Sequence, residues 1–210
     1  MQGRLDEARG LVALDRVILG ELGQRYLAAS ATEAYGMVEL LGGDPEAAES
    51  TLRHGYAELT RMGDVSALPT VAALLAEALV AAERYDDALV LSEDARRNTD
   101  AADLAAQVQW RVPQAKALAW RGRDKKALRV ARDAVRLAGQ TDFLNLHADA
   151  LSALAEVHRM QGNRDEAAGA LSQALLRYEK KGNVVAAARA NVSLRALRRP
   201  SAERESAAAG

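Results

Sequence analysis

The chain has 210 residues and a formal net charge of −1, contains no cysteine, and is only 4% aromatic. The near-zero charge excludes a global field that would attract nucleic acid or an anionic membrane. The lack of cysteine excludes disulfides, thiolate chemistry and cysteine-ligated zinc. No signal peptide is visible, and the longest apolar run, Val71 to Ala82, is interrupted by Glu77 and is too short to span a bilayer. We therefore expect a soluble, cytoplasmic chain that is rich in helix, because alanine and leucine dominate its apolar residues.

A short turn motif opens the chain and then recurs at a fixed interval. The first copy, Gly3-Arg-Leu-Asp-Glu-Ala8, is followed by copies that end at Ala48, Ala88, Ala127 and Ala167, at intervals of 40, 40, 39 and 40 positions. In each copy a turn residue ends one helix, and acidic or polar residues begin the next. A fixed period of this size is typical of a solenoid built from repeated helix pairs.

The motif copies and a second set of breaks between them divide the chain into helices. The alanine of each motif would let two antiparallel helices approach closely, with a second small residue seven positions later on the same face. Pro113 lies inside one helix and should kink it, because proline removes a backbone hydrogen bond. Residues 199–210 lack apolar periodicity, and we expect a disordered tail. The ten expected helices span 5–22, 25–41, 45–62, 67–82, 85–98, 102–121, 124–138, 143–161, 164–181 and 183–198.

The turn motif resembles the hinge between helices A and B of the tetratricopeptide repeat (TPR). The period near 40 is longer than the usual 34, and the early Trp and the closing Pro of the family are missing. The resemblance covers residues 1–198 and implies an all-α, TPR-like superhelix of antiparallel helix pairs. It also implies right-handed coiling and a concave groove, lined by the A helices, that holds a protein segment.

Three further phrases carry a second resemblance: Val108-Gln-Trp-Arg111, Leu144-Asn-Leu-His-Ala-Asp-Ala-Leu151 and Tyr178-Glu-Lys-Lys-Gly-Asn-Val-Val185. They are similar to the C-terminal repeat region of actinobacterial proteins that join an adenylate/guanylate cyclase domain, an AAA-type ATPase and a helical array. The chain has neither a cyclase metal-binding motif nor a phosphate-binding loop. The resemblance therefore implies a non-catalytic regulatory scaffold in signal transduction. A repeat region of a transcriptional regulator that senses a peptide or ligand is the alternative.

The first expected helix, 5–22, has a wide apolar stripe that includes Leu11, Leu14 and Ile18. One neighbouring helix would not cover it. We expect either that Met1 lies within a longer array whose preceding helix covers the stripe, or that the chain starts naturally. In the second case the helix could join two copies in a freestanding homodimeric scaffold.

Counting from each hinge transfers the groove positions of the TPR family onto this chain. The set mixes charges and leans acidic, and it lacks the clamp of repeated Lys, Arg and Asn that binds a terminal carboxylate. The resemblance therefore implies a protein or peptide partner with a basic or amphipathic segment. The positions are Ser30, Glu33 and Met37; Thr70 and Glu77; Gln109, Lys116 and Trp120; and Asp149, Ser152, Glu156 and Arg159.

No residue pattern points to catalysis, a cofactor or a metal ion. His147 and His158 lie eleven positions apart on one helix, about 16 Å of rise, and cannot chelate one ion together. The basic turn Arg121-Gly-Arg-Asp-Lys-Lys126 is too small for nucleic-acid binding. We expect neither an enzyme nor a nucleic-acid or membrane-binding protein.

Overall fold

The computed structural model describes residues 2–198, and this part of the chain is helical with no strand. All ten expected helices are present within one or two residues of their predicted ends, two of them divided by a break. The tail expected over 199–210 lies outside the described residues. The helices are α1 (Leu5–Glu21), α2 (Arg25–Ser30), α3 (Thr32–Gly42), α4 (Pro45–Met62), α5 (Leu68–Ala81), α6 (Tyr85–Asn98), α7 (Leu104–Gln109), α8 (Arg111–Trp120), α9 (Asp124–Ala138), α10 (Leu144–Met160), α11 (Arg164–Lys181) and α12 (Val184–Arg198).

The turn motifs form sharp hinges between paired helices. At the first residue of each motif the backbone is left-handed, with φ of 79° at Gly3, 82° at Gly43, 59° at Glu83, 67° at Gly122 and 79° at Gly162. This conformation closes a helix C-terminus and suits glycine, which has no Cβ to clash. The hinge at Glu83 is therefore the one that carries a side chain in an unfavourable backbone conformation.

The small residues of the repeat lie where paired helices touch. Ala48, Ala88, Ala127 and Ala167 are fully buried. Seven residues after Ala48 stands Gly55, where an added Cβ would lie 2.9 Å from the carbonyl oxygen of Ala29 and collide with a neighbouring side chain. The predicted close approach of the helices is confirmed at these positions.

The range predicted as 102–121 is broken at Trp110, between α7 and α8. Pro113 has no N–H to donate to the carbonyl of Gln109, and the flanking bonds are long: 3.4 Å from the N–H of Trp110 to the oxygen of Ala106 and 3.4 Å from Gln114 to Trp110. The predicted kink is therefore confirmed. The range predicted as one helix over 25–41 is also divided, into α2 and α3.

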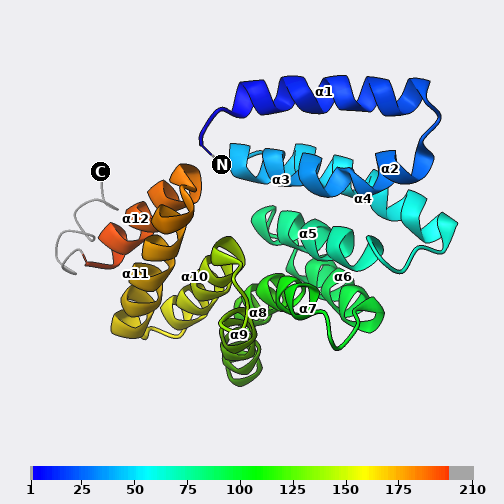
Figure 1. The fold of residues 1–210 in the computed structure, drawn as a ribbon. Helices are drawn as coiled ribbons and strands as arrows, with labels where there is room; N and C mark the ends of the chain where they lie inside the picture. The colour runs from blue at the N-terminus through cyan, green and yellow to red at the C-terminus, as the bar shows by residue number, and fades with distance from the viewer. Residues whose placement is uncertain (1, 199–210) are drawn as a thin grey trace.

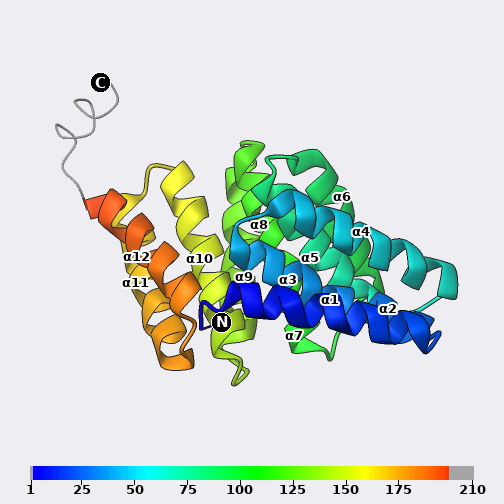
Figure 2. The same ribbon diagram turned by 90° about the horizontal axis from the view of Figure 1, so that it is seen from above.

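The helix pairs stack into a strongly curved arc whose two ends meet (Figures 1 and 2). Helices α3, α5, α8, α10 and α12 line the inside of the arc. The guanidinium of Arg189 in α12 donates hydrogen bonds to the carbonyl oxygens of Leu40 at 3.1 Å and Leu41 at 2.8 Å, at the end of α3. The arc is thus nearly closed into a ring. No helix within residues 2–198 combines the length and apolarity needed to cross a membrane.

Candidate functional site

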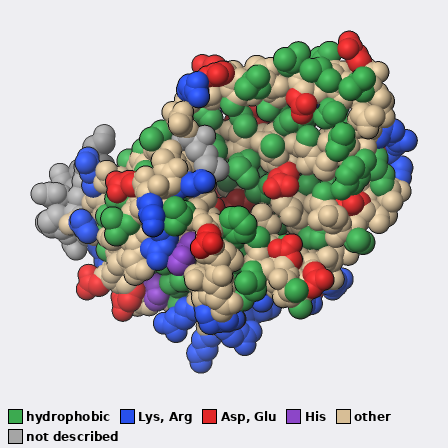
Figure 3. Space-filling model, viewed as in Figure 1, with side chains coloured by type: hydrophobic (Ala, Val, Ile, Leu, Met, Phe, Trp, Pro, Cys, Tyr) green, Lys and Arg blue, Asp and Glu red, His purple; other side chains and the backbone are tan. Residues whose placement is uncertain are grey.

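The inside of the arc holds a cavity of about 1230 Å³. The space-filling view shows this hollow between the two ends of the arc, with acidic side chains visible at its floor (Figure 3). Its wall is apolar near α3 and α8, where Leu40, Leu41 and Val112 contribute, and polar along α5, α8 and α10. An apolar cavity with a few convergent polar groups is the usual form of a binding site.

Polar side chains at equivalent repeat positions pair with one another across successive inner helices. Thr70 donates to the side chain of Gln109 at 3.3 Å, 39 positions later. Glu77 of α5 and Lys116 of α8, also 39 positions apart, form an ion pair. Because the repeat period brings equivalent positions side by side, each of these side-chain pairs links one repeat to the next.

Lys116 stands at the centre of the cavity floor. Burial alone would lower its pKa, but the carboxylates of Glu77 and Glu156 outweigh that effect and raise the pKa of Lys116, so the side chain stays charged. The second carboxylate oxygen of Glu77 is buried and has no hydrogen-bond partner among the described residues. A buried carboxylate oxygen without a donor is costly, so this ion pair is a poor source of stability.

A second polar group lies beside this pair. The hydroxyl of Tyr178 in α11 donates to Oδ1 of Asp149 at 2.6 Å and lies 3.3 Å from the hydroxyl of Ser152. Asp149 reaches the water of the cavity but sits deep among protein atoms, and this desolvation raises its pKa to about 6. Asp149 therefore changes charge near neutral pH.

Trp120 closes one edge of the floor. Its ring stacks on Tyr85 with 5.1 Å between ring centres, and its Nε1 donates to Glu156 at 3.1 Å. The indole is 44% exposed. The indole of Trp120 thus contacts the polar floor through Glu156 and is also exposed to solvent at the edge of the cavity.

The structure gathers eight of the twelve predicted groove residues, as well as Asn183, Arg189 and Tyr178, around the cavity. Glu33 and Thr70 of the predicted set do not line it, and Trp120 stands at its edge; Ser30, also assigned to the groove, lies in α2 and donates to the carbonyl of Leu27. The eight residues that line the cavity are Met37, Glu77, Gln109, Lys116, Asp149, Ser152, Glu156 and Arg159.

The groove positions predicted from the sequence do not include the parts of the wall that come from α11 and α12. Arg189 stands 40 positions after Asp149, so the repeat period carried one step further would have found it. Tyr178 belongs to an outer helix and has no equivalent signal.

Charge is unevenly distributed around the cavity. The floor brings together three carboxylates, from Glu77, Asp149 and Glu156, and the single ammonium of Lys116. Three arginines also line the cavity: Arg159 of α10, and Arg164 and Arg189, which donate hydrogen bonds to backbone carbonyl oxygens near helix ends. The three carboxylates are grouped around Lys116, so the floor is the part of the site with an excess of negative charge.

The same geometry offers little to chemistry. Within residues 2–198 no group of three or more His, Asp or Glu side chains is placed to hold a metal ion. His158 is buried in α10, and burial lowers its pKa, as it does for His147. Neither imidazole lines the cavity. The ionisable groups that line the cavity are carboxylates, arginines, one lysine and the hydroxyl of Tyr178.

Comparison with solved structures identifies the fold as a TPR-like repeat solenoid. The chain is similar to a kinesin light chain-like protein with nearly identical TPR-like repeats from Podosopora anserina, with a TM-score of 0.56 and 18% identity over 86% of this chain and 90% of that one. It is also similar to BtubC (BKLC) from P. vanneervenii, with a TM-score of 0.53 and 17% identity over 91% of this chain and 81% of that one. No family model and no curated protein matches the sequence.

Proposed function

We propose that the chain is a non-catalytic protein-interaction scaffold that holds a basic or amphipathic segment of a partner protein in the cavity. The observation that carries this proposal is the anionic floor, where three carboxylates face one ammonium beneath apolar walls. A cationic side chain would pair with the floor while apolar neighbours pack on the walls. The fold supports the same reading, because the concave surfaces of solenoids serve as extended binding surfaces.

The energetics of the floor favour binding over a structural role. A partly unpaired carboxylate at Glu77 and a carboxyl with a raised pKa at Asp149 both destabilise the unoccupied fold. A bound cation would favour the ionised form of Asp149 and would be attracted by the carboxylate of Glu77. Groups that are unfavourable without a ligand cluster at binding sites.

Fluorescence anisotropy with a labelled basic amphipathic helical peptide tests the proposal. Asp149→Asn with Glu156→Gln removes two charges without changing side-chain shape, and we expect affinity to fall about tenfold, as two charge contacts of about 0.7 kcal/mol each would give. Glu179→Gln, on the exposed end of α11, is the control and should change affinity less than about twofold.

Trp120 provides a second readout, because its indole is bonded to Glu156 at the edge of the floor. Binding at the floor should change its emission, whereas Trp110 is only 5% exposed and should respond little. No peptide binding, or equal losses in the double variant and the control, would reject the cavity as the site.

A freestanding homodimer through α1 is the second candidate. No residue of α1 is buried, and Leu11, Leu14 and Leu22 are 61%, 55% and 65% exposed. Hydrophobic side chains gather over this end of the molecule (Figure 3), and exposed apolar patches of this kind mark interaction sites. A molecular mass that falls on dilution, and falls sooner in Leu14→Glu, would support the dimer. A monomer at every concentration would contradict it.

The larger setting that we propose is a cyclase/ATPase signalling protein, with a repeat-containing transcriptional regulator as the alternative. Its support is the resemblance of three phrases, one of which includes the stacked pair Trp110 and Arg111 at the kink. Reading the coding sequence on both sides of these 210 residues decides the matter. A cyclase or ATPase domain in the same frame would support the first setting, and a DNA-binding helix-turn-helix domain would support the second.

A further inference from the structure

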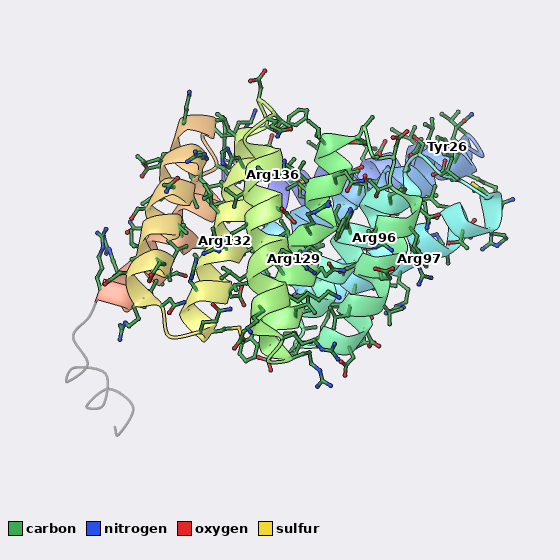
Figure 4. All side chains as sticks on the ribbon, turned by 90° about the horizontal axis from the view of Figure 1, so that it is seen from below. Tyr26, Arg96, Arg97, Arg129, Arg132 and Arg136 are labelled. Carbon is green, nitrogen blue, oxygen red and sulfur yellow. The ribbon has the colours of Figure 1, made fainter. Side chains whose placement is uncertain are left out.

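A second charged surface lies on the outside of the arc, away from the cavity. Figure 4 looks onto this face, with Arg129, Arg132 and Arg136 along α9 and Arg96 and Arg97 on α6. We call these five residues, together with Arg111 at the start of α8, the arginine face. None of the six lines the cavity.

The arginine face has more cations than the protein neutralises. Arg96 and Arg97 share one carboxylate, Glu93, at 2.7 and 3.3 Å. Arg136 reaches Asp133 only at 3.9 Å. Arg129 and Arg132 make no ion pair or hydrogen bond within residues 2–198. Six guanidinium groups therefore share three nearby carboxylates, from Glu93, Asp94 and Asp133, although the whole chain carries a net charge of −1.

These charges are close enough to repel one another. Arg111 stacks on the ring of Trp110 at 3.9 Å and donates to the backbone of Gln107. Its pKa is lowered first by burial; the carboxylate of Asp133 raises it, and the positive charges of Arg136 and Arg96 lower it further. Residues from α6, α8 and α9 thus contribute to one positive field that is only partly neutralised, and an anionic partner would stabilise it.

The arrangement on α9 fits carboxylates carried by another helix. Arg129, Arg132 and Arg136 follow one another at three and four residues, so their backbone positions rise by about 4.5 and 6 Å along one side of the helix. Acidic residues with the same three-and-four spacing on a partner helix would meet them in turn. Guanidinium groups suit this role because they bind carboxylates through two parallel hydrogen bonds.

Nucleic acid fits the arginine face less well. The exposed aromatic side chains of residues 2–198 are Tyr26, Trp120 and Phe143. Phe143 lines the cavity, Trp120 stands at its edge, and Tyr26 lies at the far end of the molecule (Figure 4). No exposed ring is available beside the arginines for base stacking. The sequence pI of about 6.3 is also far below that of a typical nucleic-acid-binding domain.

We propose that the arginine face docks an acidic helical segment of a partner protein, independently of any ligand in the cavity. The chain would then be an adaptor with two surfaces of opposite charge preference. The cavity would take a basic segment and the outer face an acidic one.

The test measures binding of a fluorescein-labelled helical peptide with glutamate at alternating three- and four-residue spacing. The variant that tests the arginine face combines Arg129→Gln, Arg132→Gln and Arg136→Gln along α9, and we call it the ridge variant. The control variant is Lys180→Gln, Lys181→Gln and Arg195→Gln, which removes three exposed cations from α11 and α12. We expect the ridge variant to lose about tenfold in affinity and the control less than about twofold. We also expect wild-type affinity to fall as salt rises.

The outcomes separate a specific surface from general charge attraction. Equal losses in the two triple variants would overturn the proposal, as would failure of the glutamate peptide to bind. Equal affinity for a matched peptide with glutamine at the same positions would also overturn it. Tighter binding of a duplex DNA probe, lost in the ridge variant, would replace the acidic protein partner with nucleic acid. Circular dichroism of all variants should be unchanged, because every substituted side chain is exposed.

Discussion

Replacing the strained hinge residue should stabilise the protein. Glu83 has φ of 59°, whereas the other four motif copies place glycine at this position. A left-handed conformation costs a residue with a Cβ about 1–2 kcal/mol. Glycine removes that cost, but it has more conformational entropy in the unfolded chain, and this lowers the gain in stability by about 0.5–1 kcal/mol. We therefore expect Glu83→Gly to raise the free energy of unfolding by about 0.5–1 kcal/mol.

Urea denaturation followed by circular dichroism measures the change. In a domain of this size a gain of 1 kcal/mol corresponds to about 2–4 °C in melting temperature. Glu83→Ala is the matched control, because it removes the carboxylate but keeps the Cβ. It should not be stabilised. Gly122→Ala is the reverse experiment at an equivalent hinge, where φ is 67°, and should lose about 1 kcal/mol.

Comparing Glu83→Gly with Glu83→Ala isolates the effect of the left-handed backbone conformation on stability. Equal stability of Glu83→Gly and Glu83→Ala would show that the hinge carries no strain and would refute the reasoning. Stabilisation of both variants would assign the effect to the carboxylate, which stands beside the acidic first turn of α6.

Three further predictions concern packing, titration and closure. Ala88→Leu or Ala127→Leu should cost about 1–3 kcal/mol by overpacking a fully buried helix contact; an unchanged urea midpoint would contradict the close approach. Because the pKa of Asp149 is raised to about 6 in the folded state, its contribution to stability is present at low pH and is lost as pH rises from about 4 through 6. The melting temperatures of Asp149→Asn and wild type should therefore diverge as pH rises across that range, and Asp149→Asn should be the more stable above pH 6. Melting temperatures that depend on pH in the same way in both proteins would refute this. Arg189→Ala removes two hydrogen bonds between α12 and α3, so small-angle scattering should show a larger maximum dimension, and an identical profile would show that the contact does not hold the ends together.

The sequence predicted the helices well because their ends are determined locally. Asp44 caps α4 by accepting a hydrogen bond from the N–H of Ala47 at 3.0 Å, and Pro45 begins the helix. Gly43 and Gly63, just before and just after α4, are left-handed. Such signals act over a few residues and can be recognised without knowing the tertiary fold. The break at Ala31 was missed because its cause is tertiary: the α2–α3 junction packs against Gly55 of α4.

The cavity residues were predicted to the extent that they follow the repeat period. Glu77 and Lys116 occupy equivalent positions in successive repeats, and the structure pairs them. Glu33 was placed in the groove by the same count but does not line the cavity. Burial raises its pKa. Counting along the repeat predicts which face of a helix a residue occupies. How deeply that residue is buried depends on how the first repeat is tilted against its neighbours.

Closure of the arc changes what the groove can accept. A solenoid's curvature is the sum of small rotations between neighbouring repeats, and no single motif encodes that sum. An open groove would admit a long extended segment along its whole length. Here α12 reaches α3 through Arg189, so a partner must enter from one face of the ring or separate its ends. The hydrogen bonds of Arg189 are exposed, and Gly3 also lies close to Val184 at the start of α12, so separation costs little compared with a buried interface. Under the proposed function, a segment too large for the closed cavity would bind only the open form and would shift the population towards it.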